Sequence, residues 1–150
     1  MFFCIPGYLE YLSRNGDVVL IAHCIEYPPV PEKRFPYAYD YIGEWKDEVE
    51  KLRTKAKVLL HHYQTVCHVD YKHKQINCRP IILDGHKPGQ VIIEEAVNEN
   101  VDAVIIGARG LGKLRRTVLG SVSDFVVHHC PVPVTVVPPE SWKHHYPHHS

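Results

Sequence analysis

The residues best suited to bind a ligand lie in one run, GARGLGKLRRTVLGS, from Gly107 to Ser121. Glycine has no Cβ, so Gly107, Gly110 and Gly120 allow backbone N–H groups to approach an oxyanion closely. Ser121 adds a hydroxyl, and nearby cations could neutralise a bound anion. We therefore expect this loop to bind phosphate. The sequence does not choose among its four cations, which are Arg109, Lys113, Arg115 and Arg116.

The elements on either side suit this chemistry. The apolar run 103–106 predicts a buried strand, and residues 121–129 predict a short helix. A strand, a glycine-rich loop and a helix N-terminus together form a common phosphate site. A capping box at Ser121 and Asp124 is an alternative that needs no ligand. The dinucleotide fingerprint is excluded because Arg115 replaces its third glycine, and no P-loop motif occurs.

The rest of the chain alternates between helical and strand patterns. A helix is expected before Gly16, then a helix over 41–68 and another over 88–100, each followed by a strand. The expected strands cover 18–25, 75–83, 103–106 and 132–137, and Pro80 favours an edge position or a bulge for the second. This order predicts an α/β fold with a parallel sheet and helices on both faces.

The composition narrows the function classes. At 150 residues, with 17 basic and 17 acidic side chains, the chain predicts one domain over 1–140 and no nucleic-acid partner. Its apolar runs are too short to span a membrane. Five unevenly spaced cysteines favour the cytoplasm. The histidines of 61–73 are interpreted as solvated rather than as metal ligands, and 141–150 as a disordered His-rich tail.

The glycine spacing is the most specific signal. Gly107-x-x-Gly110, nine residues and then Gly120-Ser121 resembles the motif of universal stress proteins that bind ATP. The segments DVVLIAHCIEYP, KPGQVIIEEAVNENVDAVIIG and the run to Glu140 are also similar to that family. The resemblance implies a doubly wound, Rossmann-like sheet of five parallel strands in the order 3-2-1-4-5.

The resemblance also implies a site and a role. The motif residues would hold ATP, with Mg²⁺ as a possible companion ion, and the backbone of Cys24 would contact adenine. The expected function is nucleotide sensing in the stress response, with slow or no hydrolysis, in a homodimer that pairs through Val132–Val137. The alternatives are a nucleotide-free dimerisation or scaffold module and a small phosphohydrolase. The expected nucleotide contacts are Gly107, Arg109, Gly110, Gly120, Ser121, Val122 and Cys24.

The beginning of the chain departs from the family pattern. Family members start with a strand that ends in Asp and occupies the centre of the sheet. Residues 1–6 are too short for that strand, its loop and the start of a helix. We therefore expect the first central strand to be missing or truncated. Each backbone group left buried and unpaired there would cost about 1–3 kcal/mol.

Overall fold

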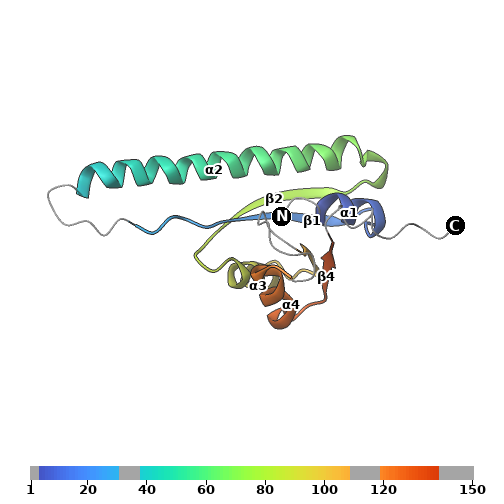
Figure 1. The fold of residues 1–150 in the computed structure, drawn as a ribbon. Coiled ribbons are helices and arrows are strands. Elements are labelled where there is room, and N and C mark those ends of the chain that lie inside the picture. The colour runs from blue at the N-terminus through green and yellow to red at the C-terminus, as the bar shows by residue number, and fades with distance from the viewer. Residues whose placement is uncertain (1–3, 31–37, 109–118, 139–150) are drawn as a thin grey trace.

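The computed structural model describes residues 4–30, 38–108 and 119–138, which form an α/β fold with parallel strands (Figure 1). The predicted alternation of helices and strands is confirmed. The elements in chain order are α1 (Cys4–Tyr11), β1 (Val18–Ile25), α2 (Ala38–Val69), the 3₁₀ helix η1 (Lys72–Lys74), β2 (Asn77–Asp84), α3 (Pro88–Asn98), β3 (Val104–Gly107), α4 (Ser121–His129) and β4 (Val134–Val137).

The described strands form two separate sheets. β1 pairs in parallel with β2, and β3 pairs in parallel with β4. Among the described residues β1 and β3 pair with no other strand, so each keeps a free edge. The division falls where the order 3-2-1-4-5 places its first strand, as the sequence predicted. Pro80 lies in β2, which pairs only with β1 among the described strands and in an unbroken register, so of the two predicted alternatives the edge position is confirmed.

The larger hydrophobic core lies between the β1–β2 sheet and two helices. α2 runs along the face of this sheet, and its apolar positions recur every three or four residues, as in an amphipathic helix. α1 adds Leu9, which is fully buried. Together they enclose the core cluster of Leu9, Ile21, Leu60, Tyr63, Cys67, Ile76 and Cys78.

Two further helices lie on the other side of the β1–β2 sheet (Figure 1). α3 contacts both strands of that sheet and also α4. The α3–α4 contact is tight, because a Cβ built on Gly89 would lie 2.7 Å from Cδ1 of Phe125. The smaller β3–β4 sheet packs beside α4 and α1. Helices therefore cover both faces of the larger sheet, as predicted.

α1 connects the two sheets. Its Leu9 belongs to the core of β1 and β2, and a Cβ on Gly7 would lie 2.8 Å from Cγ1 of Val137 in β4. The helix ends at Tyr11 rather than near Gly16, although Gly16 has the predicted left-handed backbone, with φ of 83°. It begins before Pro6, which a first helical turn accepts because its N–H groups need no partner there. Among the described helices, none has the length and apolarity that a membrane span requires.

Candidate functional site

The strand registers place the candidate site at the carboxyl ends of the strands. Ile25 lies opposite Asp84, and Gly107 lies opposite Val137, so each pair of strands ends at the same level. In open parallel sheets, ligands bind beyond these ends. The predicted phosphate loop begins at one of them, directly after Gly107.

Hydrogen bonds hold the two ends of the β3–α4 connection close together. The N–H of Ala108 donates to the carbonyl of Val137 at 2.9 Å, and the N–H of Gly120 donates to the carbonyl of Ala108 at 2.8 Å. The hydroxyl of Ser123 donates to the carbonyl of Gly107 at 2.7 Å. Ser123 is 2% exposed and was not predicted to be a site residue. The end of β3 and the start of α4 therefore lie next to each other.

The start of α4 offers backbone donors. Its N-cap is Gly120, no side chain caps it, and Ser121 is its first helical residue. The capping-box interpretation of Ser121 and Asp124 is therefore wrong, because the cap position belongs to a glycine. First-turn N–H groups have no acceptor within the helix and lie at the positive end of its dipole. They form an anion-binding geometry beside Gly107.

The predicted nucleotide contacts fall into three groups. Gly107, Gly120, Ser121 and Val122 gather where β3 ends and α4 begins. Arg109 and Gly110 lie outside the described residues. Cys24 lies in the other sheet, opposite Leu83.

The thiol of Cys24 is neutral at physiological pH. It is half-buried, and burial, followed by the carboxylates of Glu26 and Asp84, raises the pKa of Cys24 to about 11. A neutral, partly buried thiol is a poor nucleophile and a poor metal ligand. The useful groups at this position are therefore its backbone N–H and C=O, and their contact with adenine stays a prediction.

Asp84 organises the ends of β1 and β2. Its Oδ1 accepts the hydroxyl of Tyr27 at 2.5 Å, and its Oδ2 accepts Nη2 of Arg53 at 2.7 Å. The Arg53 guanidinium also lies 5.7 Å from the centre of the Tyr27 ring. Burial and the bond to Asp84 raise the pKa of Tyr27. Both carboxylate oxygens are thus engaged within the protein, so Asp84 is poorly placed to act as a general base.

Most described histidines lie on exposed surfaces, whereas His23 in β1 is half-buried and its burial lowers its pKa. His61, His62 and His68 are exposed on α2. His128 and His129 occupy the last turn of α4, as predicted, and each places Nδ1 2.8 Å from the carbonyl four residues earlier. Over the described ranges, no three or more His, Cys, Asp or Glu side chains are grouped to hold a metal ion.

Sequence comparisons match most of the chain to one family. The model of the universal stress protein family matches residues 9–138. Universal stress protein Sll1388 of Synechocystis is 43% identical over 133 residues, which cover 83% of this chain and 81% of that protein. A universal stress protein of Thermus aquaticus, encoded in the QAH/OAS sulfhydrylase 3′ region, is 29% identical over 126 residues, 83% of this chain and 80% of that protein.

Solved structures share the same architecture. The hypothetical protein MJ0577 superposes with a TM-score of 0.68 at 22% identity, covering 91% of this chain and 86% of that chain. A family protein of Arabidopsis thaliana, solved with AMP bound, superposes with a TM-score of 0.58 at 21% identity, covering 92% and 77%. At these identities the likeness shows the fold alone, which is the doubly wound α/β fold.

Proposed function

Because this chain belongs to the universal stress protein family, we propose that it binds an adenine nucleotide, ATP above all, at the β3–α4 connection. The observation that carries the proposal is the uncapped first turn of α4 beside the buried Gly107. Amide donors at the positive end of a helix suit the charge of a phosphate chain. The AMP bound to the Arabidopsis relative supports an adenine nucleotide as the ligand.

The proposed contacts are those that the sequence predicted. Gly107, Gly120, Ser121 and Val122 bind phosphate and ribose, and the backbone of Cys24 contacts adenine. Arg109 and Gly110 complete the loop, and Mg²⁺ accompanies the phosphates. Hydrolysis is slow or absent, because Asp84 is engaged by Tyr27 and Arg53.

The proposed role is nucleotide sensing in the cytoplasm during stress. The uneven spacing of the five cysteines supports a reducing compartment. A nucleotide-free scaffold of the same fold is the second candidate. It is favoured by the division of the sheet between β1 and β3, next to the proposed nucleotide site. The two candidates differ in whether ATP binds at all.

Calorimetric titration with ATP·Mg²⁺ tests the proposal. We expect binding by the unaltered protein and none by Gly120→Val, whose branched side chain would occupy the phosphate position. Gly43→Val is the matched control, because Gly43 lies in α2 with no atom within 4 Å of its built Cβ. Absence of binding at millimolar ATP would contradict the proposal and favour the scaffold. Multiple-turnover phosphate release would instead indicate a phosphohydrolase.

We also propose a homodimer that pairs through Val132–Val137. β4 pairs only with β3 among the described strands, and an apolar edge strand of this kind needs cover. Thr135 is exposed on β4, so Thr135→Lys should shift the mass measured by light scattering from dimer to monomer. Thr54→Lys, at an exposed position of α2, should leave it dimeric. A monomeric mass for the unaltered protein would contradict the proposal.

A further inference from the structure

The two sheets have unpaired edges where the sheet is divided. Among the described strands, β1 pairs only with β2, and β3 pairs only with β4. The helices contact both sheets. α3 packs on β1, β2 and α4, while α1 contacts β3 and β4 and places Leu9 in the core cluster that contains Ile21 of β1. The helices thus hold the two sheets together, although no described strand joins the free edges of β1 and β3.

The hydrogen bonds between β1 and β2 show which backbone groups of β1 are unpaired. Along a strand, the N–H and C=O of one residue point to one edge, and those of the next residue point to the other. The N–H of Asn77 donates to the carbonyl of Asp17 at 2.9 Å, so the odd-numbered residues face β2. The N–H of Gly85 donates to the carbonyl of Ile25 at 3.4 Å, in the same phase. The residues that face the free edge are therefore Val18, Leu20, Ala22 and Cys24.

The same reasoning identifies the unpaired groups of β3. The N–H of Val104 donates to the carbonyl of Pro133 at 2.9 Å, so the even-numbered residues of this strand face β4. Ile105 and Gly107 therefore face the free edge, where the carbonyl of Gly107 accepts the hydroxyl of Ser123. Within the described ranges, no backbone group pairs with the N–H and C=O groups on either free edge.

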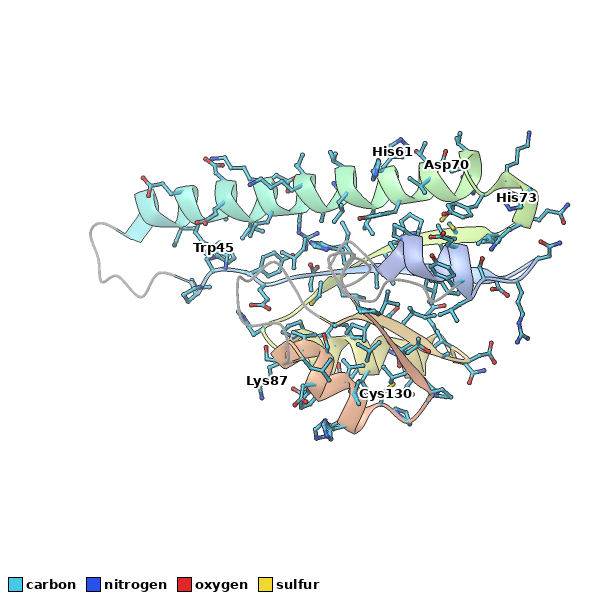
Figure 2. The ribbon with its side chains drawn as sticks, turned by 45° about the vertical axis from the view of Figure 1, so that its right-hand side comes forward. Trp45, His61, Asp70, His73, Lys87 and Cys130 are labelled. Atoms are coloured by element: carbon cyan, nitrogen blue, oxygen red, sulfur yellow. The ribbon has the colours of Figure 1, made fainter. Side chains whose placement is uncertain are left out.

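The free edge of β1 is accessible although helices cover both faces of its sheet. Ile21 and Ile25 are each 3% exposed, whereas Ala22, which lies between them, is exposed. Figure 2 shows α2, which carries His61, on one side of the β1–β2 sheet, and α4, which ends before Cys130, on the other. A strand added at this edge would be buried on both faces, and such strands are apolar throughout.

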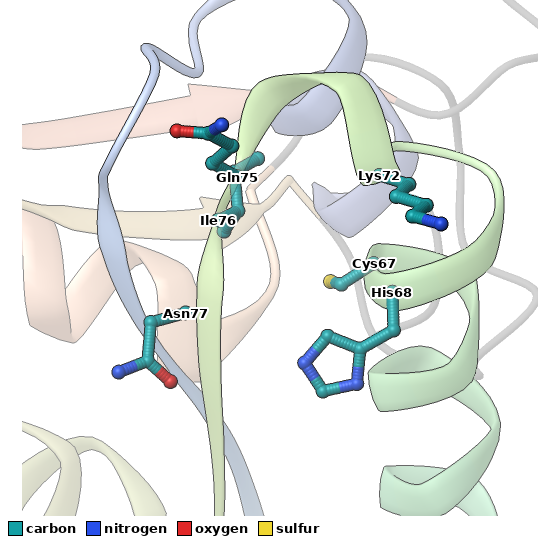
Figure 3. Close-up of a pocket in the computed structure, with 6 residues that line it drawn as sticks. All are labelled: Cys67, His68, Lys72, Gln75, Ile76 and Asn77. Carbon is teal, nitrogen blue, oxygen red and sulfur yellow. The ribbon is translucent and has the colours of Figure 1, made fainter.

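The outer edge of β2 has less need of a further strand. Pro80 carries no N–H, and the carbonyl of Cys78 accepts Nε2 of Gln64 at 3.4 Å. A pocket of about 340 Å³ lies next to the start of β2, where Cys67 is directed from the end of α2 towards the strand (Figure 3). Of the eight residues of β2, Asn77 alone lines this pocket, so the pocket does not follow the strand.

The segments of this sequence that lie outside the described residues are poorly suited to pair with these edges. Residues 109–118 carry four cations and two glycines, which do not suit a strand buried on both faces. Residues 31–37 and 139–150 each contain two prolines, which remove donors from a central strand. Residues 1–3 are fewer than the four of β3, and the apolar segments of a second copy already form its own strands. A strand of a different protein therefore fits best.

We propose that the free edges of β1 and β3 bind an extended segment of another protein, which is apolar on both faces and joins the two sheets into one. Its length is between the four residues of β3 and the eight of β1. On one side the segment pairs with the N–H and C=O groups of Leu20 and Ala22, and on the other side with those of Ile105. Valine and isoleucine suit it, and proline does not. Cys24 and Gly107 lie near the carboxyl ends of the two strands, beyond this pairing, so the segment binds whether or not a nucleotide does.

Fluorescence anisotropy with the full chain tests the proposal. The probe is a fluorescein-labelled synthetic peptide of six valine and isoleucine residues, flanked by lysines that keep it soluble. We expect saturable binding without nucleotide. The same peptide with N-methylated amides in its apolar part keeps the side chains but loses the donors, and it should bind at least about tenfold more weakly because several hydrogen bonds are lost together. Equal binding of the two peptides, or no binding of the first, would overturn the proposal.

Ala22→Pro removes one donor from the free edge of β1 and leaves the hydrogen bonds to β2 intact. Pro80, which lies opposite Ile21 and faces the outer edge of β2, shows that this pair of strands accepts proline at an outward position. The variant should bind the peptide at least about fivefold more weakly. Ala22→Val is the matched control, because it keeps the N–H, and its affinity should stay close to that of the unaltered protein. Undiminished binding by Ala22→Pro would contradict the pairing.

Amide hydrogen exchange, measured for each residue by nuclear magnetic resonance, needs no substitution. In the unbound protein the N–H groups of Leu20, Ala22 and Ile105 should exchange faster than those of Ile21 and His23, which face β2. The peptide should slow exchange at the first three by at least about tenfold. Slow exchange there in dilute protein without peptide would show that a segment of this chain already covers the edges, and would overturn the proposal. Protection that rises with protein concentration would overturn it as well, because the occupant would then be a second copy.

Discussion

The first half of this molecule, formed by β1, β2 and α2, is built differently from the second half, formed by β3, β4 and α4. β1 and β2 pair over eight residues each and pack against a 32-residue helix, whereas β3 and β4 pair over four residues each. The first half contains the large core cluster. The second half carries the glycine-rich connection and the uncapped start of α4.

Because of this difference, the first half mainly provides stability and the second half provides the groups for ligand binding. In the first half the polar groups at the strand ends bind one another, as Asp84 does with Tyr27 and Arg53. In the second half the backbone donors at the start of α4 are left without a side-chain cap. The half with the shorter strands therefore holds the groups that a ligand could use, and α1 contacts both of these strands.

The largest effect on stability is expected from Leu9→Ala, because Leu9 lies in α1, the helix that connects the two halves. Leu9 is fully buried, and removing such a side chain from a core costs about 2–5 kcal/mol. The free energy of unfolding in urea should fall by that amount, and amide exchange in β3 and β4 should quicken because α1 contacts both. Leu12→Ala is the control, since Leu12 is 46% exposed and should change stability by less than about 0.5 kcal/mol. Unchanged exchange in β3 would show that the halves are independent.

Ser123→Ala tests the second half alone. The substitution leaves the carbonyl of Gly107 without its hydroxyl donor, which should cost about 1–3 kcal/mol of unfolding free energy and weaken ATP binding. Ser121→Ala should weaken ATP binding without a comparable loss of stability, because Ser121 is exposed. Urea unfolding and calorimetry on both variants separate the two roles. Equal destabilisation by both would contradict the assigned hydrogen bond.

The smallest effect concerns pH and the first half. The backbone N–H of Arg14 and then the hydroxyl of Tyr8 hold the pKa of Asp17 below its ordinary value of 3.8. A lowered carboxyl pKa contributes stability that is present above the unfolded pKa and is lost as the pH falls through the folded one.

In Asp17→Asn, the fall in the free energy of unfolding below pH 4 should therefore be smaller than in the unaltered protein, by about 1 kcal/mol or less. Urea unfolding measured from pH 6 down to pH 2 checks this expectation. Asp102→Asn, at an exposed turn of the second half, is the control. If the free energy of unfolding of Asp17→Asn depends on pH as that of the unaltered protein does, the hydrogen bonds of Asp17 contribute nothing to stability.

Local pattern predicted much of the fold. β1 has the predicted bounds, and α2 follows from its apolar stripe, because these signals lie within the element itself. The predicted end of α1 near Gly16 was wrong, because the left-handed backbone of Gly16 belongs to the turn before β1 and the helix already ends at Tyr11. The divided sheet was predicted from the few residues before α1 and from the strand order that the family resemblance implies.

The site was predicted only in part. Glycine spacing predicted a phosphate site in the connection after β3, because backbone access depends on local residues. Ser123 and the Asp84 network were missed because their partners meet only through packing. Arg53 lies 31 residues from Asp84, and no local pattern relates them.

The length of α2 has a consequence for the behaviour of the molecule in solution. Its 32 residues span about 48 Å at 1.5 Å per residue, whereas an eight-residue strand spans about 27 Å. Figure 1 shows the N-terminal part of the helix extending past the ends of β1 and β2. A compact chain of this size has a radius of gyration of about 15 Å. Small-angle scattering of the monomeric Thr135→Lys variant should give a larger value, with the long tail in the pair-distance distribution that a rod projecting from a globule produces.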